Sequence, residues 1–467
     1  MLIQFTIQNF LSFRDEVTFS MVAVNSDSQH GDHLAQHEAG EGRSVLPIAA
    51  IYGANAAGKS NLIKAIAFAQ NLVLEGTRST QTIAIHPFKL GDCSKNPSKF
   101  EFIFTYKGSQ YSYGFTLNRE QILEEWLYGI PQGKKKEIRY FERFTSIQDS
   151  NPAKTTIEFG SIIKGKARKD EQNLNFIALG TRPNQLFLTE SIDRNLNTLM
   201  PVYNWFSNAL TVIPADVDCT GLEVSVQRNK KFRNFLDGFL QVTGTGINSV
   251  VDEKIEVNFD QHLATMHKST REKLLQELDN RPEVTVEKSQ GGREIFSKDD
   301  MGKVTLTRLK TIHLAENGDF INFSIEEESE GTQRLIHLIP ALFLLQQESE
   351  KIIFLDELDR RLHPLLSRYF VETAINCRAR SNQLIFTTHD TNLLDLDLLR
   401  RDEIWFVEKN KNGVSDCYSL AEFKIRPDLK IEKGYLNARF GAIPFFGNPK
   451  DLGWFECEDS LSDKANR

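Results

Sequence analysis

The sequence has few cysteines and no pattern that would make them metal ligands or disulfide partners. Its 467 residues include five cysteines, which are scattered and form no C-x-x-C pair. This spacing argues against a zinc finger and against the disulfide framework of a secreted domain. The N-terminal segment MLIQFTIQNFLSF also lacks the basic start and small-residue cleavage site of a signal peptide. We therefore expect a cytoplasmic protein in a reducing compartment.

Long apolar runs are missing as well. The longest, Leu335 to Leu345, is too short to span a bilayer and contains a histidine and a proline. We expect no membrane segment. No heptad pattern persists over several turns, which argues against an extended coiled-coil arm.

The chain has no excess of positive charge. Its formal net charge is −7, so the whole molecule has no general attraction for nucleic acid, and a DNA contact would need a local basic patch. Two basic clusters are candidates, although solvated loops are the more ordinary interpretation: Lys134, Lys135, Lys136 and Arg139, then Lys164, Lys166, Arg168 and Lys169.

One short motif indicates a phosphate-binding site. The segment GANAAGKS, residues 53–60, fits the pattern G-x-x-x-x-G-K-[ST]. In this pattern the glycines let the backbone N–H groups face phosphate oxygens, and the lysine, here Lys59, adds a positive charge. The hydroxyl of Ser60 is placed to bind Mg²⁺.

The flanks of the motif have the required pattern. Residues 45–52, VLPIAAIY, form the apolar run of a strand that is buried on both faces. After the motif, Leu62, Ile63, Ile66 and Val73 fall on helical spacing. The order strand, glycine loop, helix is the structural setting that a phosphate-binding loop requires.

Two apolar runs late in the chain end in polar residues that suit phosphoryl transfer. Ile352 to Glu357, IIFLDE, predicts a strand whose Asp356 holds Mg²⁺ and whose Glu357 orients or deprotonates the attacking water. A second run ends at His389, which could contact a terminal phosphate at the edge of a parallel sheet. Before these strands, Ser329 and Gly331 open a helical stretch whose N-terminus could face an anion.

The rest of the pattern suggests a division of the chain. Alternating residues around Lys107 and Gly108 predict a β-hairpin, which together with the N-terminal strands indicates an antiparallel sheet. Residues 228–240 and 261–278 read as helices. We therefore expect an α/β fold with four parts: a mixed lobe at 1–130, an inserted and largely helical middle domain at 131–315, a C-terminal α/β lobe at 316–455, and a polar tail at 456–467.

This ordered set of motifs resembles the ATP-binding-cassette ATPases of the SMC and double-strand-break-repair type. GANAAGKS resembles their Walker A motif, ESEGTQ at 328–333 their signature, IIFLDE their Walker B motif, residues 360–363 their D-loop and His389 their switch histidine. More narrowly, DELDRRLHP, TTHDTNLLD and KGYLNARFGAIP are similar to the compact bacterial ATPases of defence operons, the RloA-like group, with AriA of the PARIS system and OLD-family heads as relatives.

The resemblance implies a P-loop ATPase head of the ABC type with a specific set of roles. Glu357 and His389 would be catalytic, and Ser60 and Asp356 would hold Mg²⁺. ATP would be bound by Gly53, Ala54, Asn55, Ala56, Ala57, Gly58, Lys59, Ser60, Asn61, Arg14, Ser329 and Gly331. The two signature residues would act on a neighbouring copy, because such heads sandwich ATP in a homodimer or higher homo-oligomer. The output would be a nucleotide-dependent switch in antiphage defence that controls a separate effector, a nuclease or toxin.

Several alternatives stay open at this point. A DNA-tethering or repair ATPase with a mechanical output is the main one, and a non-hydrolysing scaffold is another. Asp395 and Asp397 have the D-x-D form of a nuclease metal site, although too little chain follows them for a TOPRIM domain. His30, His33 and His37, with Asp32 and Glu38 nearby, suggest a metal site, but their polar, glycine-containing segment favours a flexible loop.

Overall fold

The computed structural model describes most of the chain. The described residues are 1–24, 30–36, 44–146, 155–164, 168–215, 222–264, 266–281, 283–287, 293–298, 301–424 and 431–443. The polar tail that we predict at 456–467 lies outside them. Within the described residues, none of the helices combines the length and the apolar character that crossing a bilayer requires.

The centre of the molecule is a six-stranded sheet in which five neighbouring strands are parallel and the last is antiparallel. Its order is β11 (Leu210–Ile213), β17 (Ile352–Leu355), β18 (Gln383–Thr387), β5 (Ile48–Tyr52), β19 (Ile404–Lys409) and β20 (Ser415–Ser419). Every residue of β5 is buried. Ala49 and Ile51 face one hydrophobic core, whereas Ile48, Ala50 and Tyr52 face another. The predicted double-sided strand is confirmed over Ile48–Tyr52.

Helices cover both faces of this sheet. Helix α1 (Lys59–Glu75) packs into the first core through Leu62, Ile63 and Ile66, as its spacing predicts. Helices α10 (Glu330–Gln347) and α11 (Pro364–Cys377) pack into the second core on the opposite face. The three layers form the doubly covered sheet of an α/β nucleotide-binding fold.

A seven-stranded antiparallel sheet adjoins this core. Its order is β10 (Thr155–Phe159), β9 (Ile138–Thr145), β8 (Ile122–Ile130), β7 (Ser109–Leu117), β6 (Ser98–Tyr106), β1 (Leu2–Gln8) and β2 (Val17–Ser20). The predicted hairpin is confirmed as β6 and β7, with Lys107 and Gly108 in the turn at positive φ. The sheet does not end at the predicted boundary after residue 130, because β8 and β9 pair across it, with Leu127 opposite Phe141.

The segment at 131–315 contains strands that the prediction did not include. Its described helices cover more residues than its described strands, but β9, β10, β11 and strands of a further sheet also lie within it. After the short helices α2 (Ser161–Lys164), α3 (Arg168–Gly180), α4 (Phe187–Asp193) and α5 (Met200–Asn204), the chain returns to the central sheet as β11, its edge strand. Within 131–213, β9 and β10 therefore extend the seven-stranded sheet and β11 completes the central sheet.

The inserted unit begins only after β11 and is built on a sheet. Helices α6 (Leu222–Arg228) and α7 (Lys230–Val242) precede a five-stranded antiparallel sheet. Its strands are β12 (Ile247–Glu256), β13 (Glu283–Glu287), β14 (Arg293–Lys298), β15 (Val304–Leu314) and β16 (Phe320–Ser324), with α8 (Phe259–His262) and α9 (Lys268–Asn280) between β12 and β13. The predicted helix at 228–240 is α7, whereas that at 261–278 is divided between α8 and α9.

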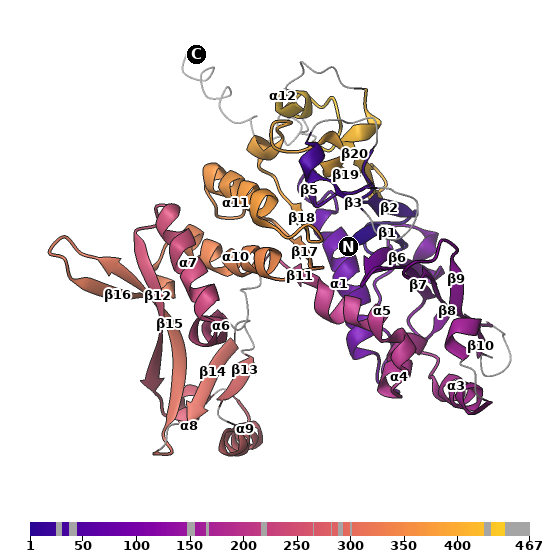
Figure 1. Cartoon of the computed structure of the whole chain (residues 1–467), viewed down its shortest axis with the longest axis horizontal. Helices are drawn as coiled ribbons and strands as arrows, with labels where there is room; N and C mark the ends of the chain where they lie inside the picture. The colour runs from indigo at the N-terminus through magenta and orange to yellow at the C-terminus, as the bar shows by residue number, and fades with distance from the viewer. Residues whose placement is uncertain are drawn as a thin grey trace, which may run out of the picture.

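The inserted unit is attached to the core through helix packing. Phe232, Leu236 and Phe239 of α7 share the second hydrophobic core with α10. Figure 1 shows the five-stranded sheet on the left and the seven-stranded sheet on the right, with α10 and the central sheet between them. The segments that carry the sequence motifs all lie in this central part.

Candidate functional site

The loop after β5 has a backbone that only its own glycines permit. A Cβ on Gly53 would lie 2.3 Å from the carbonyl oxygen of Val407, and one on Gly58 would lie 2.5 Å from Ser415 Oγ. Gly58 also has φ +123°, a conformation that side chains rarely adopt. The loop ends in the first turn of α1, where backbone N–H groups have no partner within the helix. These N–H groups can donate to a phosphate. The close approach of the loop backbone to β19 fits the same interpretation.

Lys59 is the buried cation of this loop. Its side chain is 5% exposed, and Nζ donates to the carbonyl oxygens of Gly53 (2.8 Å) and Ala54 (3.2 Å). Burial lowers the pKa of Lys59 to about 8, although the nearby carboxylates of Asp356, Glu357 and Asp359 oppose the shift. The ammonium group is therefore held in place by its hydrogen bonds. Its positive charge is poorly compensated by the surroundings, and this favours the binding of an anion.

The predicted metal-binding pair is assembled. Ser60 Oγ donates to Asp356 Oδ1 over 3.2 Å, although the two residues are hundreds of positions apart. Thr387 at the end of β18 donates to the same Oδ1 over 2.6 Å and accepts from the backbone N–H of Glu357 over 2.7 Å. A hydroxyl and a carboxylate are ligands that Mg²⁺ prefers, so the residues present fit that ion. Thr387 is a positioning residue that the sequence did not single out.

Glu357 and His389 stand at the ends of neighbouring strands. Glu357 has a left-handed backbone, φ +50°, and a carboxylate 3.7 Å from Arg360 Nη1. The backbone N–H of His389 donates to the Asp359 carboxylate over 3.2 Å. Desolvation and the charge of Lys59 lower the pKa of His389, against the effect of the three acids nearby. The imidazole is accordingly neutral at physiological pH, with one ring nitrogen able to donate a hydrogen bond and the other able to accept one.

These residues share one cavity of about 480 Å³. It is lined by Asn55, Ala56, Ala57, Gly58, Lys59, Ser60, Asn61, Glu357, His389 and Lys409. The structure thus brings together the phosphate loop, the acidic strand end and the histidine that the sequence places far apart. Lys409 is a cation that the sequence analysis missed, because its position at the end of β19 marks it only once β19 is known to pair with β5.

A smaller cavity of about 290 Å³ adjoins the first. It shares Asn61 and Lys409 with the phosphate-loop cavity and is otherwise lined by Leu11, Ser12, His86, Pro87, Phe88, Lys89, Leu90 and Gly413. Asn61, which lines both cavities, donates from Nδ2 to Ser12 Oγ over 2.8 Å. The lining combines apolar surface with a few polar groups, the usual character of a site for a planar organic group.

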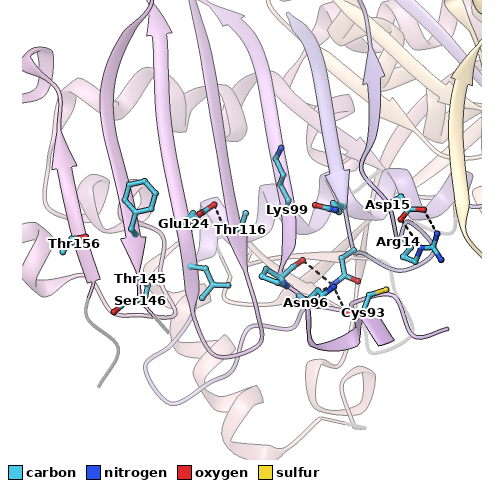
Figure 2. Close-up of a pocket in the computed structure, with 15 residues that line it drawn as sticks. Arg14, Asp15, Cys93, Asn96, Lys99, Thr116, Glu124, Thr145, Ser146 and Thr156 are labelled. Carbon is cyan, nitrogen blue, oxygen red and sulfur yellow. Dashed lines mark hydrogen bonds and ion pairs between the residues drawn. The ribbon is translucent and has the colours of Figure 1, made fainter. Parts of the chain in front are cut away.

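Arg14 lies elsewhere, which corrects its predicted role. Its guanidinium pairs with Asp15 in the same turn through two hydrogen bonds of 3.0 and 2.8 Å. Both residues line a separate cavity of about 1,010 Å³ on the seven-stranded sheet, together with Cys93, Asn96 and Lys99 (Figure 2). Arg14 lines this other cavity, and it is not among the described residues that line the phosphate-loop cavity.

Ser329 and Gly331 stand apart from the phosphate-loop cavity of their own chain. Ser329 is exposed and caps α10 by accepting from the backbone N–H of Thr332 over 3.2 Å. A Cβ on Gly331 would lie 2.8 Å from the carbonyl oxygen of Arg361, so only glycine fits against this loop. Of the residues that the structure describes, those lining the cavity do not include this pair.

Helix α10 is nevertheless connected to the acidic strand end. Arg334, one turn into the helix, is largely buried, and its Nη2 donates to the carbonyl oxygens of Asp356 and Glu357, each over 3.2 Å. Arg361 Nε also lies 3.3 Å from a carboxylate oxygen of Glu330. A movement of α10 would therefore reach the backbone that carries the two acids.

The other polar clusters are less organised for binding. Lys134, Lys135 and Lys136 are exposed between β8 and β9, but Arg139 is paired with Glu142 and Glu158. Lys166 lies outside the described residues. Asp395 of the D-x-D segment forms a salt bridge with Arg368, with 2.9 Å between Asp395 Oδ2 and Arg368 Nη1.

Comparison with known proteins identifies the family. The model of the AAA_21 family, described as "AAA domain, putative AbiEii toxin, Type IV TA system", matches residues 48–395, a span that runs from the phosphate loop past the histidine strand. The chain belongs to the AAA_21 family. Its members carry an AAA domain, a domain of the P-loop ATPase type, and this family implies nucleotide and Mg²⁺ as ligands. No curated protein matches it.

Solved structures offer weaker likenesses. The SMC head domain from Thermotoga maritima is 12% identical with a TM-score of 0.35, over 91% of this chain and 99% of that one. The SMC head bound to the C-terminal winged-helix domain of ScpA is 14% identical with a TM-score of 0.36, over 90% and 97%. An SMC head with an extended coiled coil, bound to the C-terminal domain of ScpA derived from Pyrococcus furiosus, is 12% identical with a TM-score of 0.33, over 94% and 98%. TM-scores this low assign no role to any residue and no function to the chain.

The pKa of Lys59 predicts a pH dependence of nucleotide binding. The free protein loses the ammonium charge as pH rises through about 8, whereas bound phosphates stabilise that charge and raise the pKa in the complex. Affinity for ATP should therefore be constant between pH 7 and 7.5 and fall by up to about tenfold per pH unit above 8. Calorimetric titration at pH 7.5, 8.5 and 9.5 measures this. Lys59→Arg, whose charge does not titrate in this range, should give a flat profile; an equal slope in that variant would assign the effect to another group.

Proposed function

We propose that this chain is an ATP-hydrolysing switch in antiphage defence that controls a separate effector, a nuclease or a toxin. The observation that carries the ATPase part is the convergence of Lys59, Glu357 and His389 on one cavity next to the Ser60–Asp356 pair. The family description, which names a toxin of a type IV toxin–antitoxin system, supports the defence part.

Each residue of the cavity has a role that its position suggests. Bound ATP–Mg²⁺ would supply the phosphoryl group that passes to water. Lys59 holds the phosphates, and Ser60 and Asp356 hold the metal ion. Glu357 orients and deprotonates the attacking water from the end of β17, and Thr387 keeps the backbone of Glu357 in position. His389, with its lowered pKa, donates a hydrogen bond without adding a positive charge beside Lys59.

The adjoining cavity is the proposed binding site of the nucleoside. Its apolar lining suits a base, and Lys409 lies between the two cavities, where it can reach the sugar or the phosphates. Lys409 and Ser12 therefore replace Arg14 as the proposed contacts outside the phosphate loop.

A second copy would complete the site. Ser329 caps the N-terminus of α10 at the surface, where the helix can present N–H groups to an anion on another molecule. This fits a homodimer in which each Ser329 and Gly331 contact the nucleotide of the partner. Arg334 then links that contact to the backbone of Asp356 and Glu357 in its own chain, so that binding in one subunit can alter geometry in the other.

The test is ATP-dependent assembly of Glu357→Gln. This variant should bind ATP, fail to hydrolyse it, and elute from gel filtration at twice the monomer mass with ATP–Mg²⁺ but not without it. Adding Ser329→Arg to this background should remove the assembly while nucleotide binding to the single chain persists, because the bulky cation blocks the surface that meets the partner. Ser161→Arg, on the exposed start of α2, is the matched control and should assemble normally.

The defence role is tested with the same variants in cells. Phage plating should drop on cells that carry the native locus and recover when Glu357→Gln or Ser329→Arg replaces the wild-type chain. Unchanged elution of Glu357→Gln with ATP would refute the switch, whereas assembly without any effect on phage plating would refute only the defence assignment.

A further inference from the structure

Three potential metal ligands gather at residues 30–33, outside the phosphate loop. His30, Asp32 and His33 lie in a short 3-10 turn, η1 (Gly31–His33), between β2 and β3 (Ala35–Gln36). Their ligand atoms are all within 4.8 Å of one another, and the two imidazole rings stack at 23°. The expected flexible loop is therefore wrong for these residues, because His33 is only 4% exposed. His37 and Glu38 lie outside the described residues.

Hydrogen bonds orient both imidazole rings. His30 Nε2 lies 2.7 Å from the carbonyl oxygen of Leu396. A carbonyl can only accept, so Nε2 donates, and in the neutral ring Nδ1 carries the lone pair. His33 Nδ1 lies 3.0 and 3.1 Å from the two carboxylate oxygens of Glu403. One of those oxygens also accepts from the backbone N–H of Arg400, so Glu403 acts as an acceptor and His33 presents the lone pair of Nε2.

This is the arrangement that metal-binding histidines require. Such a histidine donates its second N–H to a carboxylate or a backbone carbonyl, which sets the tautomer and the ring orientation. Here both kinds of acceptor are present, one for each ring.

We infer that His30 Nδ1, His33 Nε2 and the Asp32 carboxylate form a binding site for one Zn²⁺ ion. Two imidazoles and one carboxylate are typical zinc ligands, and water can take the fourth position. Zn–N bonds of about 2.0–2.1 Å place tetrahedral ligands roughly 3.4 Å apart. Asp32 is exposed and can rotate to close the remaining distance. Arg378 donates to the carbonyl oxygen of His33, and burial lowers its own pKa against the opposing charges of Glu403 and Asp32.

The position of the site gives it a structural role. Residues 30–33 follow the N-terminal strands, whereas Leu396 and Glu403 flank the loop that leads into β19, the strand next to β5. A bound ion would hold these two segments together beside the central sheet. Metal binding should therefore stabilise the folded chain even without nucleotide.

The experiment measures zinc binding and melting temperature of the EDTA-stripped full-length protein without ATP. We expect one Zn²⁺ per chain and a higher melting temperature with Zn²⁺. Asp32→Asn and His30→Ala change residues outside the buried core and should each weaken zinc binding at least tenfold. Glu403→Gln should weaken it about 10- to 100-fold through the orientation of His33.

Two controls locate the effect. His267→Ala changes an exposed histidine at the start of α9 and should leave zinc binding unchanged. Asp356→Asn tests whether zinc instead enters the predicted Mg²⁺ site. The inference is overturned if the wild-type chain binds no Zn²⁺ under these conditions, or if Asp32→Asn and His30→Ala bind it as tightly as the wild type while remaining folded.

Discussion

Lys59→Ala is expected to abolish ATP binding. The ammonium group is nearly fully buried in the phosphate loop, and alanine removes the charge that faces the phosphates. Hydrogen bonds to charged groups contribute about 1.5–3 kcal/mol each, so losing two contacts corresponds to a loss of roughly 10²- to 10⁴-fold in affinity. Titration with a fluorescent ATP analogue measures the effect directly.

The folded state should survive this change. In the free protein the lysine is an unfavourably buried cation whose pKa is lowered to about 8. Its removal relieves that cost below pH 8, which offsets the lost hydrogen bonds to Gly53 and Ala54. Lys64→Ala is the matched control, because Lys64 is exposed on the same helix, and it should bind ATP normally. Equal affinity in the two variants would refute the assignment of the phosphate site.

Much of this site could be predicted because its parts are local sequence patterns that all lie at the same edge of the sheet. The phosphate loop, Asp356–Glu357 and His389 each follow an apolar strand, and in a parallel sheet the carboxyl ends of neighbouring strands meet at one edge. The sequence therefore predicts that edge even though the strands β5, β17 and β18 are far apart along the chain. The order in which the three strands pair is known only from the structure.

The predictions that differ from the structure depend on contacts between side chains or strands that no local sequence pattern indicates. Arg14 was placed by analogy of position, and its neighbour Asp15 holds it in another cavity. The sheet of the inserted unit was missed because charged residues interrupt its strands, as in β12, INSVVDEKIE, so the alternation is weak. The histidines at 30 and 33 read as a loop because the groups that fix their rings, Leu396 and Glu403, lie in the last quarter of the chain.

Glu357→Gln is expected to separate binding from hydrolysis. Glutamine has nearly the same shape, so the left-handed backbone and the hydrogen bond from its N–H to Thr387 can be kept. It cannot take a proton from water. A general base typically contributes about 10²- to 10⁴-fold, and the steady-state rate of phosphate release should fall by that factor while the affinity for ATP changes by less than about threefold.

A matched control and a second acid make this result specific to Glu357. Glu326→Gln changes an exposed acid near the start of α10 and should leave the rate of phosphate release unchanged. Asp356→Asn should instead weaken Mg²⁺-dependent binding, because Asp356 Oδ1 is the atom that accepts from both Ser60 and Thr387. If Glu357→Gln keeps a rate within threefold of wild type, the base is another residue of the cavity, and His389 becomes the group to change next. If both acids give the same loss of binding and rate, then Glu357 holds the metal with Asp356 and the division of roles between them is wrong.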